Sequence, residues 1–230
     1  SPSKSELSQA LYGACNWHFG NMNNAKKAAG LETQKMKYNP IKKSAYKISK
    51  EFAYVLGVVY GDGSVYIIEN DHGSCGKIQL KVRESDFALY FRKILEKWSG
   101  LNARYFFDNN YFYNVILSSV DACRIIKNFN LNKILKWKKE LQYEFLKGLF
   151  DSDGGIIGHN LNNRKYAKRW IHFSNNNLTL IKLVKRIFEK MQIKYSINRR
   201  IKSGFGSKKW QYQIQIYNLK DIFKYYKNIG

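Results

Sequence analysis

Two apolar segments of this chain end in the same way, in an aspartate that lies between small residues. The first is YVLGVVYGDGS, residues 54–64, and the second is FLKGLFDSDGG, residues 145–155. Each has the character of a buried helix, and each carries two small residues four positions apart, which share one face of a helix. These small residues are Gly57 and Gly61 in the first segment and Gly148 and Ser152 in the second. Small residues let helix backbones approach closely, so we predict that the two helices pack together and that Asp62 and Asp153 meet.

A carboxylate at the C-terminus of a helix is disfavoured by about 0.3 to 1 kcal/mol, because that end carries partial negative charge. Two carboxylates that meet there need a compensating positive charge. Divalent cations take oxygen ligands from carboxylates, backbone carbonyls and water, so they are the natural candidates. The alternative is that each Asp-Gly only ends a helix, with Gly63 and Gly154 as left-handed caps. The occurrence of the pair in a duplicated chain favours the cation site.

The segments that follow the two aspartates repeat the same order of elements. Periodicity and turn residues predict a β-hairpin, a helix, a second hairpin and a short helix after each aspartate. In the first half the helix covers residues 86–98, Gly100 ends it, and the second hairpin turns at residues 108–110. We therefore predict an α+β fold built from two αββαββα repeats, residues 46–138 and 139–230.

Residues 1–45 lie outside this duplication. Their pattern predicts short helices that are split by Gly13, Gly20 and Gly30, with Lys26 and Lys27 exposed. Such a segment is typical of a helix-turn-helix-like arm that contacts DNA. The alternative is a basic extension that packs on the core.

The charge of the chain indicates a polyanionic partner. Lys and Arg number 40 against 17 Asp and Glu, which gives a formal net charge of +23, and this favours nucleic acid. The three cysteines show no CxxC spacing, so neither a disulfide framework nor a zinc ribbon is supported, and an intracellular location is expected, cytoplasmic or, in a eukaryote, organellar. The longest apolar run, residues 52–60, is far below the roughly 20 residues of a membrane helix. We expect no membrane partner.

The predicted strands alternate polar and apolar residues, so each has one face that is suited to nucleic acid. Arg and Lys suit guanine and Gln suits adenine in the DNA major groove. The outward residues expected to contact DNA are Lys77, Gln79, Lys81 and Arg83 in the first half, and Lys168, Trp170, His172, Ser174, Gln211, Gln213 and Gln215 in the second. Basic residues near the last hairpin are expected to contact phosphates, namely Arg199, Arg200, Lys202, Lys208 and Lys209. The alternative for any one of these strands is that its polar face is only exposed to solvent and binds no nucleic acid.

VLGVVYGDGS and LKGLFDSDGG resemble the two motifs of the LAGLIDADG homing endonucleases in their single-chain, two-repeat form, and the resemblance covers residues 50–230. Tyr60 stands where the family usually has its first acidic residue, but the last acid, Asp62, is present. The segment WHFGNMNNAKKAAGLE is similar to a small helical repeat that is found attached to homing endonucleases. The resemblance implies motif helices at a central interface and antiparallel sheets that form a saddle in the DNA major groove.

The activity that this resemblance implies is double-strand cleavage of DNA at a long, specific site, with short 3′ overhangs, Mg²⁺ or Mn²⁺ as cofactor, and intron homing as its result. The implied catalytic metal ligands are Asp62 and Asp153, with the carbonyls of Gly61 and Ser152 nearby. Arg83 and Asn175 are the implied water-ordering residues at the ends of the second strands. Because the two halves differ in sequence, we expect a monomer on an asymmetric site rather than a homodimer.

Two alternatives remain open from the sequence. One is a binding protein of the same fold, either a maturase that helps an intron RNA to fold or a cleavage-inactive DNA-binding protein. The other is a sheet-based RNA-binding module, which needs aromatic pairs on an exposed sheet face, and Trp170 is the clear candidate for that role. The chain does not end in the His-Asn of a self-splicing intein, so a free-standing, intron-encoded enzyme is expected.

Overall fold

The structure is a computed structural model that describes residues 8–31, 40–70, 73–159, 168–202 and 209–229. The chain divides into two compact units, residues 1–39 and residues 40–230. Each unit is described by itself.

The small unit contains two helices, α1 (Gln9–Phe19) and α2 (Met22–Ala28). Ser8 Oγ accepts a hydrogen bond from the Leu11 amide and begins α1, and Gly20, at φ 75°, ends it. Gly13 was predicted to divide the helices, but it lies inside α1. A single glycine costs a helix only about 1 kcal/mol relative to alanine, and good caps at both ends offset that cost.

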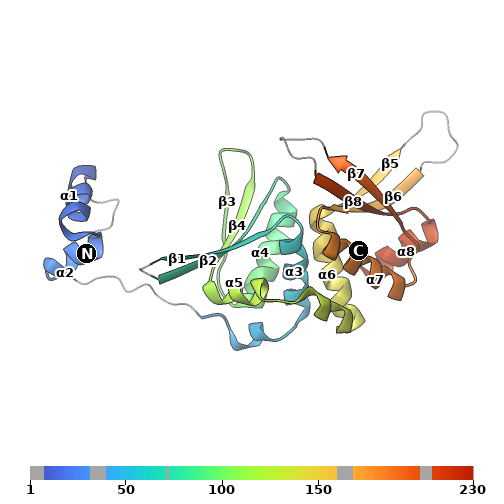
Figure 1. Cartoon of the computed structure of the whole chain (residues 1–230), viewed down its shortest axis with the longest axis horizontal. Helices are drawn as coiled ribbons and strands as arrows, with labels where there is room; N and C mark the ends of the chain where they lie inside the picture. Colours follow the sequence, from blue (N-terminus) through green and yellow to red (C-terminus); the bar gives the residue numbers. More distant parts are fainter. Residues whose placement is uncertain (1–7, 32–39, 71–72, 160–167, 203–208, 230) are drawn as a thin grey trace. The chain divides into compact units, whose positions relative to one another are not determined.

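The large unit contains the predicted αββαββα order twice (Figure 1). The first repeat is α3 (Lys50–Tyr60), β1 (Ser64–Asn70), β2 (Gly73–Val82), α4 (Ser85–Ser99), β3 (Arg104–Phe107), β4 (Tyr113–Ser118) and α5 (Val120–Lys127). The second repeat is α6 (Lys139–Asp153), β5 (Gly154–His159), β6 (Lys168–Asn175), α7 (Leu178–Lys190), β7 (Ser196–Lys202), β8 (Lys209–Ile216) and α8 (Leu219–Asn228). Short 3₁₀ helices, η2 (Lys43–Tyr46) and η3 (Leu131–Lys136), precede the two repeats. The predicted fold class is confirmed.

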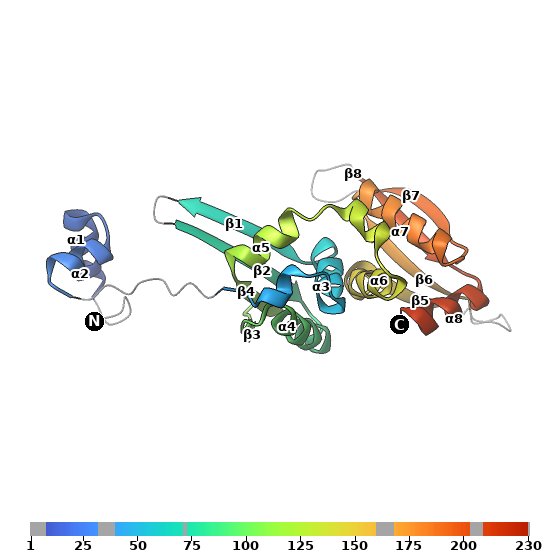
Figure 2. The same ribbon diagram turned by 90° about the horizontal axis from the view of Figure 1, so that it is seen from below.

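Each repeat folds into a four-stranded antiparallel sheet, with strand orders β1-β2-β4-β3 and β5-β6-β8-β7. In β2, Ile78 and Leu80 are fully buried while Lys81 is exposed, so one face of the sheet joins the core and the other stays open. Figures 1 and 2 show α3 and α6 side by side between the two sheets. The motif helices therefore form the central interface.

Residues 40–45 were grouped with the arm in the sequence analysis, but they pack in the large unit. Ile41 and Ala45 are buried there, and the Trp98 indole donates a hydrogen bond of 3.1 Å to the Ala45 carbonyl.

A buried glutamine holds the segment that connects the two repeats. The Gln142 side-chain amide donates hydrogen bonds to the backbone carbonyls of Ile134, Leu135 and Trp137.

Within the described ranges, none of the helices combines the length and the apolar character needed to cross a membrane.

Candidate functional site

The motif helices α3 and α6 touch backbone to backbone. A Cβ atom at Gly57 would lie 2.2 Å from the Phe145 carbonyl oxygen, and one at Gly148 would lie 2.2 Å from the Tyr54 carbonyl oxygen. No side chain fits into such a gap, so both positions require glycine. The predicted packing along the small residues is confirmed.

The same contact continues to the ends of the helices, next to the two aspartates. A Cβ atom at Gly61 would lie only 2.4 Å from Ser152 Cβ. The Ser152 hydroxyl donates to the Gly148 carbonyl at 2.8 Å, so its hydrogen bond is made within α6 and its side chain is free to pack on Gly61. Because Gly61 and Ser152 directly precede Asp62 and Asp153, this contact brings the two aspartates to one end of the helix pair.

Gly63 and Gly154 are not left-handed helix caps, contrary to the alternative considered from the sequence. Among the described glycines, positive φ angles occur at residues 20, 30 and 100, and Gly154 has φ −93°. A Cβ atom at Gly63 would lie 2.7 Å from Val59 Cα, and one at Gly154 would lie 2.4 Å from the Phe150 carbonyl oxygen. These glycines let the chain pass close to the last helical turn as it enters the sheet.

Asp153 is held in place by Asn175, the last residue of β6. The Asn175 amide donates a hydrogen bond of 2.6 Å to Asp153 Oδ2. The side-chain oxygen Oδ1 of Asn175 accepts a hydrogen bond of 2.7 Å from the Asn177 backbone amide. Asn177 in turn caps α7, because its side-chain oxygen accepts from the backbone amides of Thr179 and Leu180. Asn175 therefore ties the second-motif carboxylate to the rigid start of a helix.

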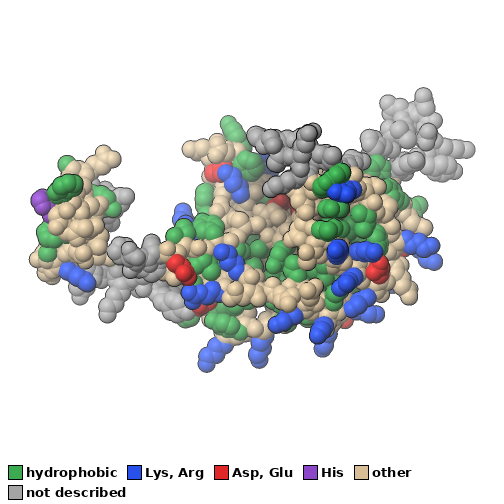
Figure 3. Space-filling model, viewed as in Figure 1, with side chains coloured by type: hydrophobic (Ala, Val, Ile, Leu, Met, Phe, Trp, Pro, Cys, Tyr) green, Lys and Arg blue, Asp and Glu red, His purple; other side chains and the backbone are tan. Residues whose placement is uncertain are grey.

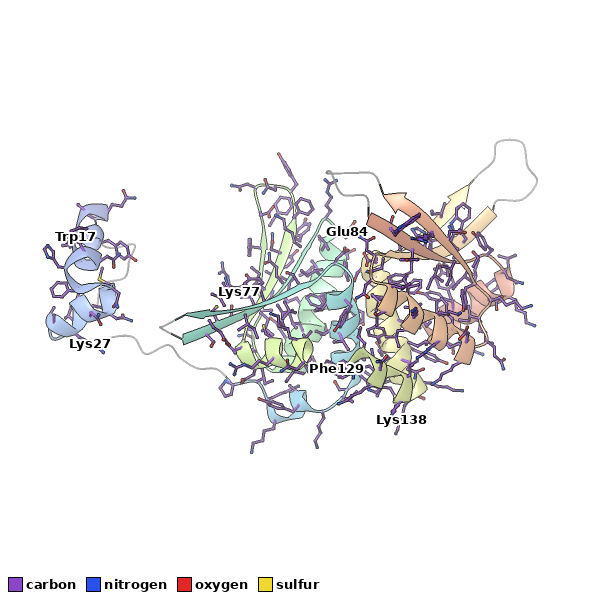
Figure 4. All side chains as sticks on the ribbon, in the orientation of Figure 1. Trp17, Lys27, Lys77, Glu84, Phe129 and Lys138 are labelled. Carbon is purple, nitrogen blue, oxygen red and sulfur yellow. The ribbon has the colours of Figure 1, made fainter. Side chains whose placement is uncertain are left out.

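Asp62 has a different neighbour at the equivalent place, the carboxylate of Glu84. Partial loss of hydration raises the pKa of Asp62, and the negative charge of Glu84 raises it further. Glu84 follows β2 and precedes α4, and Figure 4 shows it close to the central helices. The adjacent Arg83 is exposed and its guanidinium lies 5.3 Å from the centre of the Phe112 ring. The two halves of the site are thus chemically unequal.

A further contact links the two motif helices, and the sequence analysis did not identify it. The buried Tyr54 hydroxyl donates a hydrogen bond of 2.8 Å to Asp151 Oδ2. Desolvation raises the pKa of Asp151 and strongly raises that of Tyr54. One difference between the two motifs could have indicated this contact. The first motif has Tyr60 at the position where the second motif has Asp151, so this position cannot have the same role in both helices. Asp151 therefore serves the helix interface.

The donor set at the helix ends fits a hard divalent cation. Across the described ranges there is no cluster of three or more His, Cys, Asp or Glu side chains that could hold a metal. Asp62 and Asp153 offer two carboxylates, and the carbonyls of Gly61 and Ser152 adjoin them in the chain. Mg²⁺ commonly binds through one or two carboxylates and completes its shell with water and phosphate oxygens.

The open face of the first sheet carries the side chains that were predicted for it. Lys77 lies 5.9 Å from the centre of the Tyr66 ring on the adjacent strand (Figure 4). Gln79 donates to Asn114 Oδ1 at 3.3 Å. Lys81 forms an ion pair of 2.7 Å with Asp108, and this contact lowers the pKa of Asp108 to about 2. Of the three, Lys77 is the most available for a ligand, because its ammonium makes only the ring contact among the described residues.

The second sheet places aromatic and amide side chains on its open face. Trp170 and Tyr217 have ring centres 6.3 Å apart, and Tyr217 is half exposed. His172 lies opposite Gly155 and next to Gln215 in the register, and burial lowers its pKa. The alternation predicted for β8 holds, since Ile214 and Ile216 are buried on the other face.

Among the basic residues around the last hairpin, the structure describes the side chain of Arg199 and the backbone pairing of its neighbours. Arg199 pairs in register with Tyr212, and its guanidinium stacks at 3.4 Å over the Trp210 ring, so it lies on the helix side of the sheet. Arg200 pairs with Gln211, and Lys202 pairs with Lys209. Lys168, the first residue of β6, pairs with His159, and Lys208 lies outside the described residues. In the small unit, Lys26 and Lys27 lie in α2, where Lys27 is exposed (Figure 4).

Sequence comparison connects the chain to proteins of Methanocaldococcus jannaschii. It is 30% identical over 184 residues to MJ0314 of Methanocaldococcus jannaschii, an uncharacterized protein, and this match covers 75% of the chain. It is 26% identical over 192 residues to MJ0398 of the same organism, covering 80% of the chain. In both cases the chain spans 65% of the length of the relative.

Structural comparison connects it to LAGLIDADG proteins. Variants of the homing endonuclease I-DmoI superpose with a TM-score of 0.60 at 18% identity, covering 81% of this chain and 97% of theirs, and I-DmoI in complex with DNA and Mn superposes with a TM-score of 0.58 at 18% identity, covering 80% and 97%. The I-LtrWI LAGLIDADG homing endonuclease bound to target DNA gives 0.54 at 11% identity, covering 80% and 85%. The N-terminal LAGLIDADG domain of DUF199/WhiA gives 0.52 at 14% identity, covering 84% and 86%.

Because these solved structures are less than 20% identical to the chain, they show its fold alone. A match to a family model adds evidence from the sequence. Residues 140–230 match the family model of the LAGLIDADG-like domain, which includes the second motif, the second sheet and Asp153. The chain is therefore a two-repeat protein with the LAGLIDADG fold, and its second repeat matches the LAGLIDADG-like domain in sequence.

Proposed function

We propose that this protein is a divalent-metal-dependent endonuclease that cuts both strands of DNA at a long asymmetric site, as a monomer, and so promotes intron homing. The observation that carries the proposal is the contact of Gly61 with Ser152. It brings Asp62 and Asp153, from two different repeats, to the same end of one helix pair. Structural neighbours that bind DNA and Mn support both the substrate and the cofactor.

The chain's own residues have separate tasks in this reaction. Asp62 and Asp153 hold the cation, for which Mg²⁺ and Mn²⁺ are suited, and Asn175 orients Asp153 by its hydrogen bond. A bound divalent cation supplies activation of the attacking water and stabilisation of the leaving oxygen. Arg83 lies exposed beside Glu84, near the Asp62 side of the site, where its guanidinium is suited to a phosphate. No nucleophilic side chain is needed.

Positive charge and the open sheet faces supply the binding of DNA. Figure 3 shows Lys and Arg spread over the visible face of the large unit, with few Asp and Glu among them. Such a surface binds the phosphate backbone of any sequence. The amide and cationic side chains of the open faces, among them Lys77, Gln79 and Gln213, are then suited to base edges in the major groove.

A cleavage screen tests the proposal. A library of intron-insertion junctions is incubated with the chain and Mg²⁺, in parallel with EDTA and with Asp153→Asn. Asp151→Asn is the matched control, because it makes the same chemical change two residues away on the same helix and its amide oxygen still accepts from Tyr54. We expect specific double-strand cuts that persist with Asp151→Asn and vanish with EDTA and with Asp153→Asn. Cuts that survive either treatment, or binding without any cut by the unchanged chain, would contradict the proposal.

A second candidate function is the binding of intron RNA without cleavage. The Trp170–Tyr217 pair on the open face of the second sheet favours it, because unpaired bases stack on such aromatic platforms. Competition between single-stranded RNA and duplex DNA of equal length separates the two functions. Tighter binding of the RNA, lost in Trp170→Ala, would favour this second candidate.

A further inference from the structure

Four side chains on the open face of the second sheet form a chain of hydrogen bonds centred on Gln215. The Asn198 amide donates to Gln215 Oε1 at 2.7 Å, and the Tyr217 hydroxyl donates to the same oxygen. The Gln215 amide donates to Gln213 Oε1 at 2.8 Å. Gln215 is only 5% exposed, so it is enclosed by these partners and does not itself reach a ligand.

These bonds fix which way the two outer amides point. Gln213 uses its oxygen on Gln215, so its NH₂ group is directed to other partners. Asn198 uses its NH₂ group on Gln215, so its carbonyl oxygen is directed to other partners. The described residues provide no hydrogen-bond partner for Gln213 Nε2 or for Asn198 Oδ1. Asn198 and Gln213 are directly opposed in the β7–β8 register, so a donor and an acceptor lie side by side on the sheet.

We propose that Asn198 and Gln213 together read one adenine in the half-site bound by the second repeat. This inference rests on the proposed function, in which the open sheet face lies in the major groove. Adenine presents there an acceptor, N7, beside a donor, its N6 amino group. Gln213 Nε2 donates to N7 and Asn198 Oδ1 accepts from N6.

The other bases fit this pair less well. Guanine presents two acceptors, N7 and O6, so its O6 faces the carbonyl oxygen of Asn198. Thymine presents an acceptor and a methyl group, and cytosine a single donor. Each leaves at least one of the two amides without a partner in a desolvated contact, which is unfavourable. Gln215 acts as a positioning residue, because it sets the orientation of both amides.

A binding selection tests this inference. The full chain selects DNA from a randomised library in Ca²⁺, and the same selection is run with Gln213→Glu. We expect the unchanged chain to prefer adenine at one position by about tenfold, the effect of a good bidentate contact. Gln213→Glu replaces the donor with an acceptor, so this preference shifts to cytosine, whose N4 donates. Gln192→Glu makes the same charge change after α7, away from the sheet, and keeps the adenine preference.

A measurement on the DNA avoids any effect of a variant on folding. Replacement of the selected adenine by 7-deazaadenine removes N7 as acceptor. We expect this replacement to weaken binding of the unchanged chain by about tenfold, and to have no further effect on Gln213→Ala. If the unchanged chain selects no sequence, the proposed function fails. If it selects a sequence, but the profile of Gln213→Glu is the same and 7-deazaadenine has no effect, this inference alone is overturned.

Discussion

The substitution Gly57→Ala adds one carbon atom between α3 and α6. That atom would lie 2.2 Å from the Phe145 carbonyl oxygen and 2.8 Å from the Leu149 amide nitrogen. Both are backbone atoms of a helix, which do not move aside as the end of a flexible side chain does. Real Cβ contacts are not shorter than 3.0 Å, so the two helices must separate by about 0.8 Å at this point.

This separation has a cost on both stability and activity. A gap of about 0.5 to 1 Å removes a quarter to a half of each contact energy along the interface, and overpacking typically costs about 1 to 3 kcal/mol. We expect the upper end, because backbone meets backbone, and the better helix propensity of alanine offsets about 1 kcal/mol. A net loss of about 2 kcal/mol lowers the Tm of a domain of this size by about 4 to 8 °C. Displacement of the two aspartates by about 1 Å also lowers cleavage by about a hundredfold.

Thermal unfolding followed by circular dichroism measures the first effect, and cleavage of the selected site measures the second. Gly13→Ala is the matched control, since it lies inside a helix where an added Cβ meets nothing within 4 Å. The double variant Gly57→Ala/Gly148→Ala should lose less stability than the two single variants together, because one separation accommodates both methyl groups. A Tm of Gly57→Ala equal to or above that of the unchanged protein would refute the backbone contact.

Three further outcomes follow from the contacts of single side chains. The Lys97 ammonium lies 2.6 Å from Glu51 and lowers the pKa of Glu51 from its usual 4.5 to about 2. A lowered carboxyl pKa stabilises the fold above pH 4.5 and this stabilisation is lost as the pH falls toward 2, so Tm measured against pH should fall less steeply there in Glu51→Gln than in the unchanged protein. Asn175→Ala removes the hydrogen bond to Asp153, so the cleavage rate should fall by about 10- to 100-fold and cleavage should need more Mg²⁺, while DNA binding in Ca²⁺ stays the same. An unchanged cleavage rate at limiting Mg²⁺ would contradict this role of Asn175. Arg83→Ala should reduce the slope of log affinity against log salt by about 0.9, the effect of the loss of one phosphate contact, whereas Lys138→Ala, at the opposite end of α6 from the second aspartate, should leave the slope unchanged.

The repeated pattern along the chain determined the architecture. Alternating polar and apolar residues in β2 and β8, and helical spacing in α4, specify which side of each element is buried, because side-chain direction follows directly from backbone geometry. The small residues of the two motifs specified the helix interface for a similar reason. The backbones of the two motif helices touch at Gly57 and Gly148, and no larger residue fits there. The small size of these residues was therefore enough to predict the contact. Local patterns of this kind do not depend on distant parts of the chain.

The chemistry of the site was decided by contacts between residues far apart in the sequence. Asn175 meets Asp153 and Glu84 lies beside Asp62 only because each sheet returns to the end of its motif helix. Arg199 was predicted as a phosphate contact from its charge alone, and only the β7–β8 register shows that its guanidinium stacks on Trp210.

The amides of Asn198 and Gln213 are likewise oriented by a third residue, Gln215. The sequence specifies the side chains that a strand carries, whereas the pairing of strands decides which of them meet. That pairing depends on the packing of the whole repeat, and only the tertiary structure contains it.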